Sequence, residues 1–347
     1  MSERRTIFEI AAVYTAVIIG AGFATGRELI SFFLNYGDFA VAGMLLSGVL
    51  MALVGWATLE ICARNRLTGF DALLGYAAGP YVGAFIKAGA VAFLFVIFAA
   101  MLSAAGALGA QLFGLPNFAG ALVLAVLCYA AFAFDLRGLV RINTFLAPVM
   151  IAGSIGLGLY TYFADAAGVF DAAGSALRRN WAGSALIYAS YNMIAAISIL
   201  AAMSTSVRTR RAAFWGTALG SGAVTLIALS LALGLSRGLG VVDGFQVPFL
   251  RLVQDYGPLL QWAYVAVLSA AVYTTAISNG YCFYIATLQK AHANASPWVA
   301  KAAICGAALA FSQIEFTRIV ESVYPIFGLV GLLLAAILII TMLTRAD

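Results

Sequence analysis

Residues 18–33 read IIGAGFATGRELISFF, and this stretch interrupts an apolar segment long enough to enter a membrane. Gly20, Gly22 and Gly26 fall within seven residues, and two adjacent charges, Arg27 and Glu28, follow them. Lipid offers no hydrogen bonds, so a spanning segment bares its backbone only where protein or a water-filled cavity covers it. The stretch therefore predicts either close helix packing at a Gly-x-x-x-Gly pattern or a helix that breaks within the membrane.

We favour the broken helix, because glycines only two positions apart, at 20 and 22, weaken a helix instead of extending one smooth groove. The half-helix before the break would present free carbonyls that bind a cation. The half-helix after it would present free N–H groups that attract an anion such as a carboxylate. Many secondary transporters contain two such helices, one in each of two inverted repeats.

The composition of the whole chain is that of an integral membrane protein. Of its 347 residues, 64% are hydrophobic and 10% are charged, whereas soluble domains carry about 25% charged residues. Apolar stretches of roughly 20 residues recur along almost the whole length and predict a single transmembrane domain over residues 1–347. The net charge of +5 comes from Lys and Arg scattered between these stretches, which excludes nucleic acid as a partner.

Hydropathy predicts an all-α fold of ten transmembrane helices joined across the middle by an outer connection at 164–180. Twelve of the nineteen Lys and Arg residues fall on the side of the N-terminus and five on the other side. The positive-inside rule then predicts a multi-pass protein of the inner (plasma) membrane with both termini in the cytoplasm. The predicted spans are about 7–34, 39–63, 80–113, 117–134, 139–163, 181–204, 211–235, 259–289, 297–314 and 319–343.

An inverted repeat predicts a second broken helix half a chain later, in the sixth span. There LIYASYNMIAAIS, residues 186–198, places Ser190, Tyr191 and Asn192 in an otherwise apolar helix. Polar groups at this depth usually face the bundle interior. Alternatively, Tyr191 and Asn192 bond neighbouring helices. The arrangement of five plus five spans, with repeats at 7–163 and 181–343, favours the break.

The eighth span holds a third polar cluster, SAAVYTTAISNGYCF at 269–283. Thr274, Thr275 and Ser278 place hydroxyls near one helical face. Hard cations take oxygen ligands, so two hydroxyls and the carbonyls freed by the first break would hold a dehydrated Na⁺. In the alternative interpretation, the threonines bond their own helix backbone.

At these clusters the sequence resembles the LeuT-fold transporters of the amino acid, polyamine and organocation superfamily, and most of all the small ten-span YkvI-like membrane proteins. The patterns Gly-x-Gly-Phe-Ala-Thr-Gly-x-Glu at 20–28 and Tyr-x-x-Tyr-Asn at 188–192 carry the resemblance, which covers the whole chain through its topology. It implies a secondary transporter with a LeuT-type 5+5 inverted repeat and discontinuous helices 1 and 6.

The resemblance also implies where a solute and a sodium ion bind. An amino-acid zwitterion would place its carboxylate on N–H groups after Gly22 and its ammonium on carbonyls of the sixth span, although uncharged or purely cationic solutes fit the same breaks. Sodium coupling is favoured over proton coupling, because the fifth span lacks the lysine that proton-coupled relatives place near the ion. The implied solute site comprises Gly20, Ala21, Gly22, Phe23, Ala189, Ser190, Tyr191, Asn192 and Tyr273, and the implied Na⁺ ligands are Ala16, Ile19, Ala271, Thr274 and Thr275.

Further residues are predicted to surround this site. Phe95 and Phe98 either wall the pocket or belong to ordinary packing. The amphipathic stretch 244–258 is predicted to lie at the outer surface as a lid. Four charged residues form either an outer gate of ion pairs or simple interfacial anchors, namely Arg27, Glu28, Arg318 and Glu321.

Together these features predict a sodium-coupled transporter that moves a small amine-bearing solute, most simply an amino acid, across the bilayer by alternating access. An enzyme is disfavoured, because the one histidine, His292, leaves no His-rich metal site and no buried carboxylate pair stands out. A channel is disfavoured because the polar groups cluster at helix breaks. A proton-coupled or uncoupled transporter and a transporter-like nutrient receptor stay open. Neither an organic cofactor nor an obligate protein partner is implied.

Overall fold

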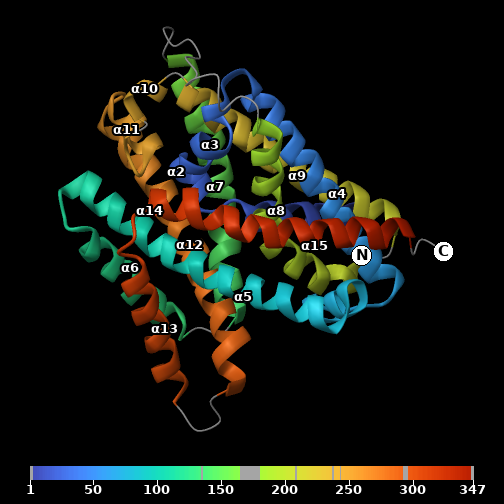
Figure 1. The fold of residues 1–347 in the computed structure, drawn as a ribbon. Coiled ribbons are helices and arrows are strands. Elements are labelled where there is room, and N and C mark those ends of the chain that lie inside the picture. The colour runs from blue at the N-terminus through green and yellow to red at the C-terminus, as the bar shows by residue number, and fades with distance from the viewer. Residues whose placement is uncertain are drawn as a thin grey trace.

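The computed structural model describes residues 3–133, 136–164, 180–207, 209–236, 238–242, 244–291 and 296–344. Within these ranges every regular element is helical (Figure 1). Residues 165–179 of the predicted outer connection, and His292, lie outside them.

The long helices follow the ten predicted apolar stretches in order. Two of them, α12 (Pro258–Ala291) and α13 (Pro297–Phe311), begin with proline, which suits the first turn because the N–H that proline lacks would have no partner there. The long helices are α1 (Glu3–Ile18), α4 (Ala40–Arg64), α5 (Phe70–Phe113), α6 (Asn117–Ala131), α7 (Leu136–Ala164), α8 (Trp181–Met203), α9 (Arg210–Ser236), α12 (Pro258–Ala291), α13 (Pro297–Phe311) and α15 (Tyr324–Thr344). The short elements are α2 (Ala21–Thr25), α3 (Arg27–Phe32), η1 (Leu34–Phe39), η3 (Ser204–Ser206), α10 (Leu239–Val242), α11 (Pro248–Gln254), α14 (Phe316–Arg318) and the π-helical turn η4 (Ile319–Val323).

Six helices in the described part of the chain are long and apolar enough to cross a membrane. Three further apolar helices, at Asn117–Ala131, Met150–Ala164 and Pro297–Phe311, are shorter. The protein is therefore membrane-embedded, while the ten-span count, the inverted repeat and the orientation stay predictions. The six long stretches are Leu34–Arg64, Phe70–Phe113, Trp181–Met203, Arg210–Ser236, Pro258–Thr287 and Phe316–Thr344.

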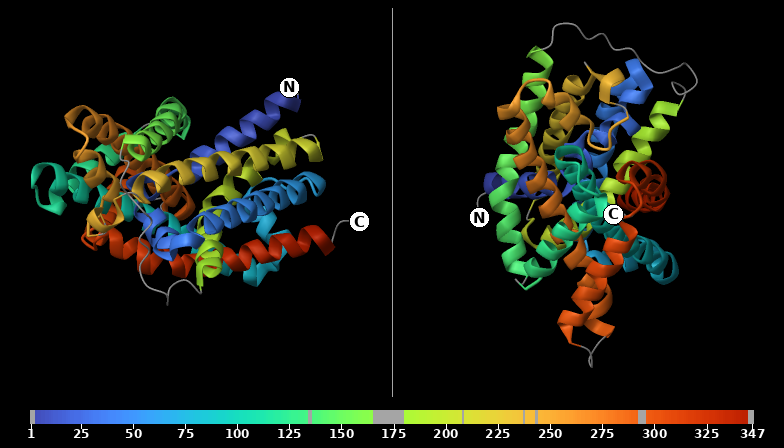
Figure 2. Two further views of the ribbon diagram at one scale, coloured as in Figure 1. Left: turned by 90° about the horizontal axis from the view of Figure 1, so that it is seen from above. Right: turned by 90° about the vertical axis from the view of Figure 1, so that its left-hand side faces the viewer.

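The helices pack as two groups that contact each other directly and through α7. In the first group α1, α9, α4 and α15 run side by side (Figure 2), and α8 packs against both α4 and α15. In the second group α12 packs on α5, and α6 packs on both α5 and α13. Helix α7 contacts both α9 and α12, and α5 contacts α15 and α8 directly, so the two groups meet at several places.

The first span is broken, as predicted. Helix α1 ends at Ile18, and α2 begins only at Ala21, after an extended Gly20 (φ −109°, ψ −177°). A second interruption at Gly26, whose φ of 81° favours glycine, separates α2 from α3. Helix α2 lies against α11 and α12, whereas α3 contacts α8 and η4. Two glycines thus divide one span into three segments that reach different neighbours.

The predicted break in the sixth span is wrong, because α8 is one continuous helix. Beyond its first turn it contains neither Gly nor Pro. Ser190 and Asn192 bond their own helix, since the Ser190 hydroxyl donates to the Leu186 carbonyl at 2.6 Å and Asn192 Nδ2 donates to the Tyr188 carbonyl at 2.9 Å. Such bonds let polar residues stay within a helix. The carbonyls of α8 are therefore engaged in the helix instead of being free for a solute.

The predicted amphipathic segment forms α11, and its apolar face is buried. Phe249 and Val253 are fully covered where α11 packs on α2, α9 and α12. On the other face, Arg251 pairs with Asp255 at 2.6 Å. Helix α11 therefore supports the broken span from one side, and its role as a lid stays a prediction.

Candidate functional site

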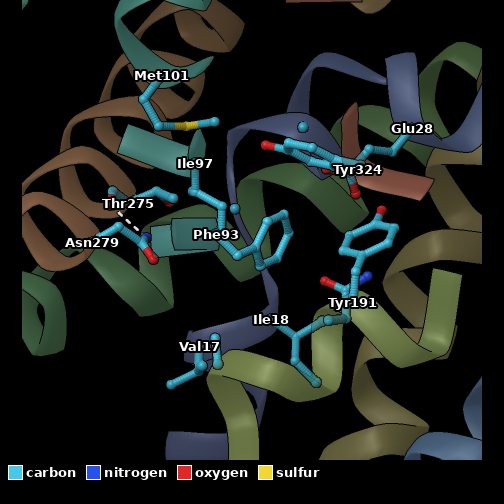
Figure 3. A pocket seen from close by; sticks show the side chains of 14 residues that line it. Val17, Ile18, Glu28, Phe93, Ile97, Met101, Tyr191, Thr275, Asn279 and Tyr324 are labelled. Carbon is cyan, nitrogen blue, oxygen red and sulfur yellow. Dashed lines mark hydrogen bonds between the residues drawn. The ribbon is translucent and has the colours of Figure 1, made fainter. Parts of the chain in front are cut away.

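A cavity of about 50 Å³ lies beside the break in the first span (Figure 3). This volume holds a few water molecules, so a larger solute requires the surrounding helices to move apart. Five spans contribute to the lining, which consists of Val17, Ile18, Gly20, Gly22 and Glu28 from the first span, Phe93, Ile97 and Met101 from α5, Tyr191, Asn192 and Ala195 from α8, Thr275 and Asn279 from α12, and Tyr324 from α15.

Four predicted solute-binding residues line this cavity, namely Gly20, Gly22, Tyr191 and Asn192. The lining does not include Phe23, Ala189, Ser190 or Tyr273, of which the first three are buried among neighbouring helices. Ala21 is the first residue of α2, and its side chain lies outside the described part. Residues of the first span and of the sixth span, which were predicted to bind the solute together, therefore line one cavity.

Helix α15 packs closely on α8 at Ser190, which is not part of the cavity lining. A methyl group added to Gly331 of α15 would lie 2.6 Å from the carbonyl carbon of Ser190, so the two backbones are in close contact there. Glycine in a membrane helix permits such an approach. Ser190 therefore lies where α8 and α15 are closely packed, whereas Tyr191 and Asn192 belong to the cavity lining.

The face of α5 that lines the cavity is not the one that the sequence indicated. Phe93, Ile97 and Met101 recur every four residues, which places them on one side of a helix. Phe95 instead packs on Phe283, with ring centroids 5.2 Å apart, and Phe98 is buried. Ordinary packing is thus the correct interpretation for Phe95 and Phe98. Because α5 is apolar all round, its hydrophobic pattern could not reveal the inward face.

Thr275 and Asn279 of α12 present polar atoms to the cavity. Asn279 Nδ2 donates to the Thr275 carbonyl at 2.8 Å (Figure 3), as Asn192 does to Tyr188 on α8. Both amide nitrogens are used within their own helices, so the amide oxygens are the atoms left to accept hydrogen bonds from a solute. Sequence reasoning missed Asn279, although its spacing of four from Thr275 was the available signal.

The break in the first span lies next to the hydroxyl of Thr275. A methyl group on Gly20 would be 3.4 Å from Thr275 Oγ1. Among the described residues, no backbone N–H donates to the carbonyls of Ala16 or Ile19, which are the predicted sodium ligands of this span. Ile19 is buried and Ala16 is exposed. The Thr275 hydroxyl therefore lies beside Gly20 at a break where two carbonyls accept no backbone N–H among the described residues.

Thr274 points in another direction from Thr275. Its hydroxyl donates to the Ala270 carbonyl at 2.9 Å and lies 3.7 Å from the sulfur of Met150 in α7. Thr274 therefore bonds its own helix backbone, as the alternative interpretation of this cluster predicted. A hydroxyl that donates its proton keeps oxygen lone pairs, so Thr274 and the buried Ala271 stay predicted parts of the ion site.

Glu28 is buried and belongs to the cavity lining. Its carboxylate lies over Gly22, because a methyl group there would be 2.5 Å from Glu28 Cδ. The side chain of Tyr191 points toward it from α8 (Figure 3), yet the Tyr191 hydroxyl has no partner at hydrogen-bonding geometry among the described residues. The sequence pattern alone placed Glu28 among the outer charged residues. It could not show where the Glu28 side chain points, because that direction depends on the turn at Gly26.

The neighbouring Arg27 turns the other way and pairs with Glu321 of η4. The Ser31 hydroxyl lies 3.2 Å from the same Glu321 oxygen. The side chain of Arg27 is 9% exposed and that of Glu321 is 41% exposed, so the pair lies at the edge of the buried region. Arg318 forms no ion pair within the described ranges. An outer gate at this pair stays a prediction.

Comparison with known proteins identifies relatives along nearly the whole chain. No protein-family model matches it. The "Uncharacterized membrane protein YkvI" of Bacillus subtilis (strain 168) is 28% identical over 333 residues, which cover 93% of this chain and 92% of the relative. The resemblance to YkvI-like proteins is confirmed. The "Uncharacterized protein YyaD" of the same organism is 22% identical over 339 residues, covering 93% of each chain.

Solved structures share the arrangement of helices. MhsT in complex with L-phenylalanine matches with a TM-score of 0.67 at 15% identity, over 97% of this chain and 88% of that chain. The manganese transporter of Eremococcus coleocola matches with a TM-score of 0.63 at 14% identity, over 99% and 80%. A Na⁺-coupled sialic acid symporter matches with a TM-score of 0.56 at 12% identity, over 93% and 75%. The chain has the LeuT-type transporter fold, and because the named solutes differ, the fold alone selects none of them.

Proposed function

We propose that the protein is a secondary transporter that moves a small amine-bearing solute, with an amino acid as the simplest example, in symport with Na⁺ by alternating access. The observation that carries this proposal is the broken first span, whose break borders a cavity shared with α5, α8, α12 and α15. Bared peptide groups at membrane depth persist where they border protein or a cavity, and in transporters they bind the solute and its coupling ion.

The surroundings of the break support Na⁺ as the coupling ion. Na⁺ is a hard cation that takes oxygen ligands. The unpaired carbonyls of Ala16 and Ile19 and the hydroxyl of Thr275 are oxygen donors at this break. The Na⁺-coupled sialic acid symporter of the same fold is consistent with this choice.

Polar groups in the cavity support an amine-bearing solute. The amide oxygens of Asn192 and Asn279 come from α8 and α12, on different walls of the cavity. An ammonium has three N–H donors and no acceptor. Phe93 and Ile97 add apolar surface for the carbon portion of the solute.

The experiment that tests this function is uptake into proteoliposomes of solutes chosen by a thermal-shift screen of amino acids and amines, with and without Na⁺. An inward Na⁺ gradient should drive accumulation, and replacing Na⁺ by K⁺ should abolish it. Thr275→Ala should raise the Na⁺ concentration needed for half-maximal uptake by about 10-fold or more, because it removes one oxygen ligand. Thr287→Ala is the matched control, because the Thr287 hydroxyl bonds the Phe283 carbonyl of its own helix, outside the cavity lining. Uptake that is equal in K⁺ would refute sodium coupling, and solute binding without net flux would refute transport in favour of a receptor.

A further inference from the structure

The unbroken α8 leaves the ammonium group of a solute without the partner that the sequence predicted. The carbonyls of α8 are engaged in its helix, and the Ser190 carbonyl also lies under Gly331 of α15. The amide oxygens of Asn192 and Asn279 are neutral acceptors, so a positively charged group in the cavity still needs a charged partner. Glu28 is a buried carboxylate in the same lining.

The charge of the cavity is unbalanced around Glu28. Among the described lining residues Glu28 is the one carboxylate, and none of the others is Lys, Arg or His. The adjacent Arg27 is paired with Glu321 on the other side of α3. A buried carboxylate is costly without a partner of opposite charge, and the strongest partner is a charged donor that hydrogen-bonds it.

The position of Glu28 also bears on the carboxylate of a solute. The Glu28 carboxyl group fills the space over Gly22, within 2.5 Å of where a methyl group on that glycine would lie. The sequence had assigned the N–H groups after Gly22 to the carboxylate of an amino acid. A second carboxylate placed there would be repelled by Glu28, because like charges in a poorly solvated site cannot readily both be ionised.

We propose that Glu28 is the residue that binds the ammonium group of the solute, and that the preferred solute class is a cationic primary amine without a free carboxylate. This inference rests on the proposed function of the cavity as a solute site and narrows its solute from amine-bearing compounds in general. The ammonium lies between Glu28 and the hydroxyl of Tyr191, which points toward that carboxylate (Figure 3).

The remaining walls suit an organic ammonium better than a bare metal cation. The rings of Phe93, Tyr191 and Tyr324 pack together, with Phe93 5.3 Å from Tyr324 and 5.9 Å from Tyr191 between centroids. Aromatic faces attract ammonium groups, and the apolar surfaces of Ile97 and Met101 match a hydrocarbon body. Na⁺ alone would leave these apolar walls without a partner.

The test is a thermal-shift titration of the purified full-length protein with three pairs of probes, each an amino acid and the amine formed from it by decarboxylation. The pairs are L-alanine with ethylamine, L-valine with isobutylamine, and L-phenylalanine with phenethylamine. At constant ionic strength, at least one amine should stabilise the wild-type protein and bind more tightly than its amino acid. Glu28→Gln keeps the side-chain shape and should weaken that amine by about 30-fold or more, as expected for loss of one partner of a buried charge pair.

Glu60→Gln is the matched control, because Glu60 is also buried but pairs with Arg64 at 2.7 Å and Arg210 at 3.3 Å, away from the cavity. It should leave the affinity for the amine unchanged. Glu28→Asp keeps the charge and retracts it, so the affinity should fall between those of wild type and Glu28→Gln. If Glu28→Gln does not fold, the amine affinity of Glu28→Asp tests the role of Glu28 instead. Because Glu28→Gln removes the repulsion, it should also reduce or reverse the preference for the amine over its amino acid.

Three results would overturn the inference: an amine affinity unchanged in Glu28→Gln, tighter binding of the amino acids than of their amines by the wild-type protein, or no stabilisation by any of the three amines. Uptake of the same amines into proteoliposomes separates this inference from the proposed function. Glu28-dependent binding without uptake would refute transport and leave the role of Glu28 intact. Uptake that is unimpaired in Glu28→Gln would refute the role of Glu28 and leave transport intact.

Discussion

The contact between Gly22 and Glu28 can be tested by a double-mutant cycle of Gly22→Ala and Glu28→Ala. An alanine at 22 would place its Cβ 2.5 Å from Glu28 Cδ and 3.0 Å from Glu28 Cγ, closer than van der Waals contact permits. Because these atoms belong to the far part of a flexible side chain, the carboxylate would be displaced instead of the backbone. We therefore expect Gly22→Ala to move the Glu28 carboxylate out of its position in the cavity.

The expected change in the free energy of unfolding combines two opposing contributions. Overpacking of this kind costs about 1–3 kcal/mol, whereas alanine stabilises a helix relative to glycine by about 0.5–1 kcal/mol. In the wild-type background Gly22→Ala should thus lower the stability by up to roughly 2.5 kcal/mol. In the Glu28→Ala background the obstructing atoms are gone, so the same change should stabilise the protein by about 0.5–1 kcal/mol. The coupling between the two positions is then about 1–3 kcal/mol.

The assay is the apparent unfolding temperature in detergent of the wild type, both single variants and the double variant. Gly222→Ala on α9 is the matched control, because a methyl group there would meet nothing within 4 Å. It therefore measures only the gain in helix stability when alanine replaces glycine. The decisive observation is the sign of the Gly22→Ala effect, which should reverse when Glu28 is alanine. An equal effect in both backgrounds would show that the Glu28 side chain does not lie over Gly22, and the assignment of Glu28 to the cavity would then fail.

Three further outcomes follow from other contacts. Lys301→Met should destabilise the protein by about 1–3 kcal/mol in chemical denaturation, because it removes a charged hydrogen bond of 2.6 Å to the Phe132 carbonyl; an unchanged midpoint would contradict this. Gly331→Ala should cost at least about 1–3 kcal/mol, since the added methyl group meets the backbone of Ser190, which cannot rotate away; wild-type thermal stability would refute the close contact. Thr275→Val, which keeps the shape and removes the hydroxyl, should shift the stabilisation by Na⁺ in a thermal-shift titration to concentrations about 10-fold higher or more, whereas an unchanged Na⁺ dependence would exclude this oxygen as a ligand.

Local sequence was sufficient to predict the break in the first span. Glycines at 20, 22 and 26 remove side chains that would support a continuous helix, and the positive φ at Gly26 is one that glycine adopts readily. The same kind of reasoning failed for the sixth span, because it depended on an expected symmetry instead of on helix-breaking residues. Ser190 and Asn192 satisfy their polar groups on their own helix, which a pattern of polar residues does not distinguish from a break.

The composition of the cavity could be predicted only in part. Gly20, Gly22, Tyr191, Asn192 and Thr275 all came from stretches where polar or small residues interrupt apolar sequence. The contributions of α5 and α15 could not be found in this way. Their helices are apolar on every face, so the choice of inward residue depends on how each helix is rotated against its neighbours.

The amino-acid sequence by itself determined that this chain is a membrane-embedded helical protein and that its first helix breaks near Gly20, because hydropathy and glycine conformational freedom act within a few residues. Only the tertiary structure decided that Glu28 enters the cavity while Arg27 leaves it for Glu321. That choice depends on the turn at Gly26 and on the elements packed around α3, which lie far away along the chain. Local patterns specify which groups are available, and the packing of distant helices specifies which of them meet.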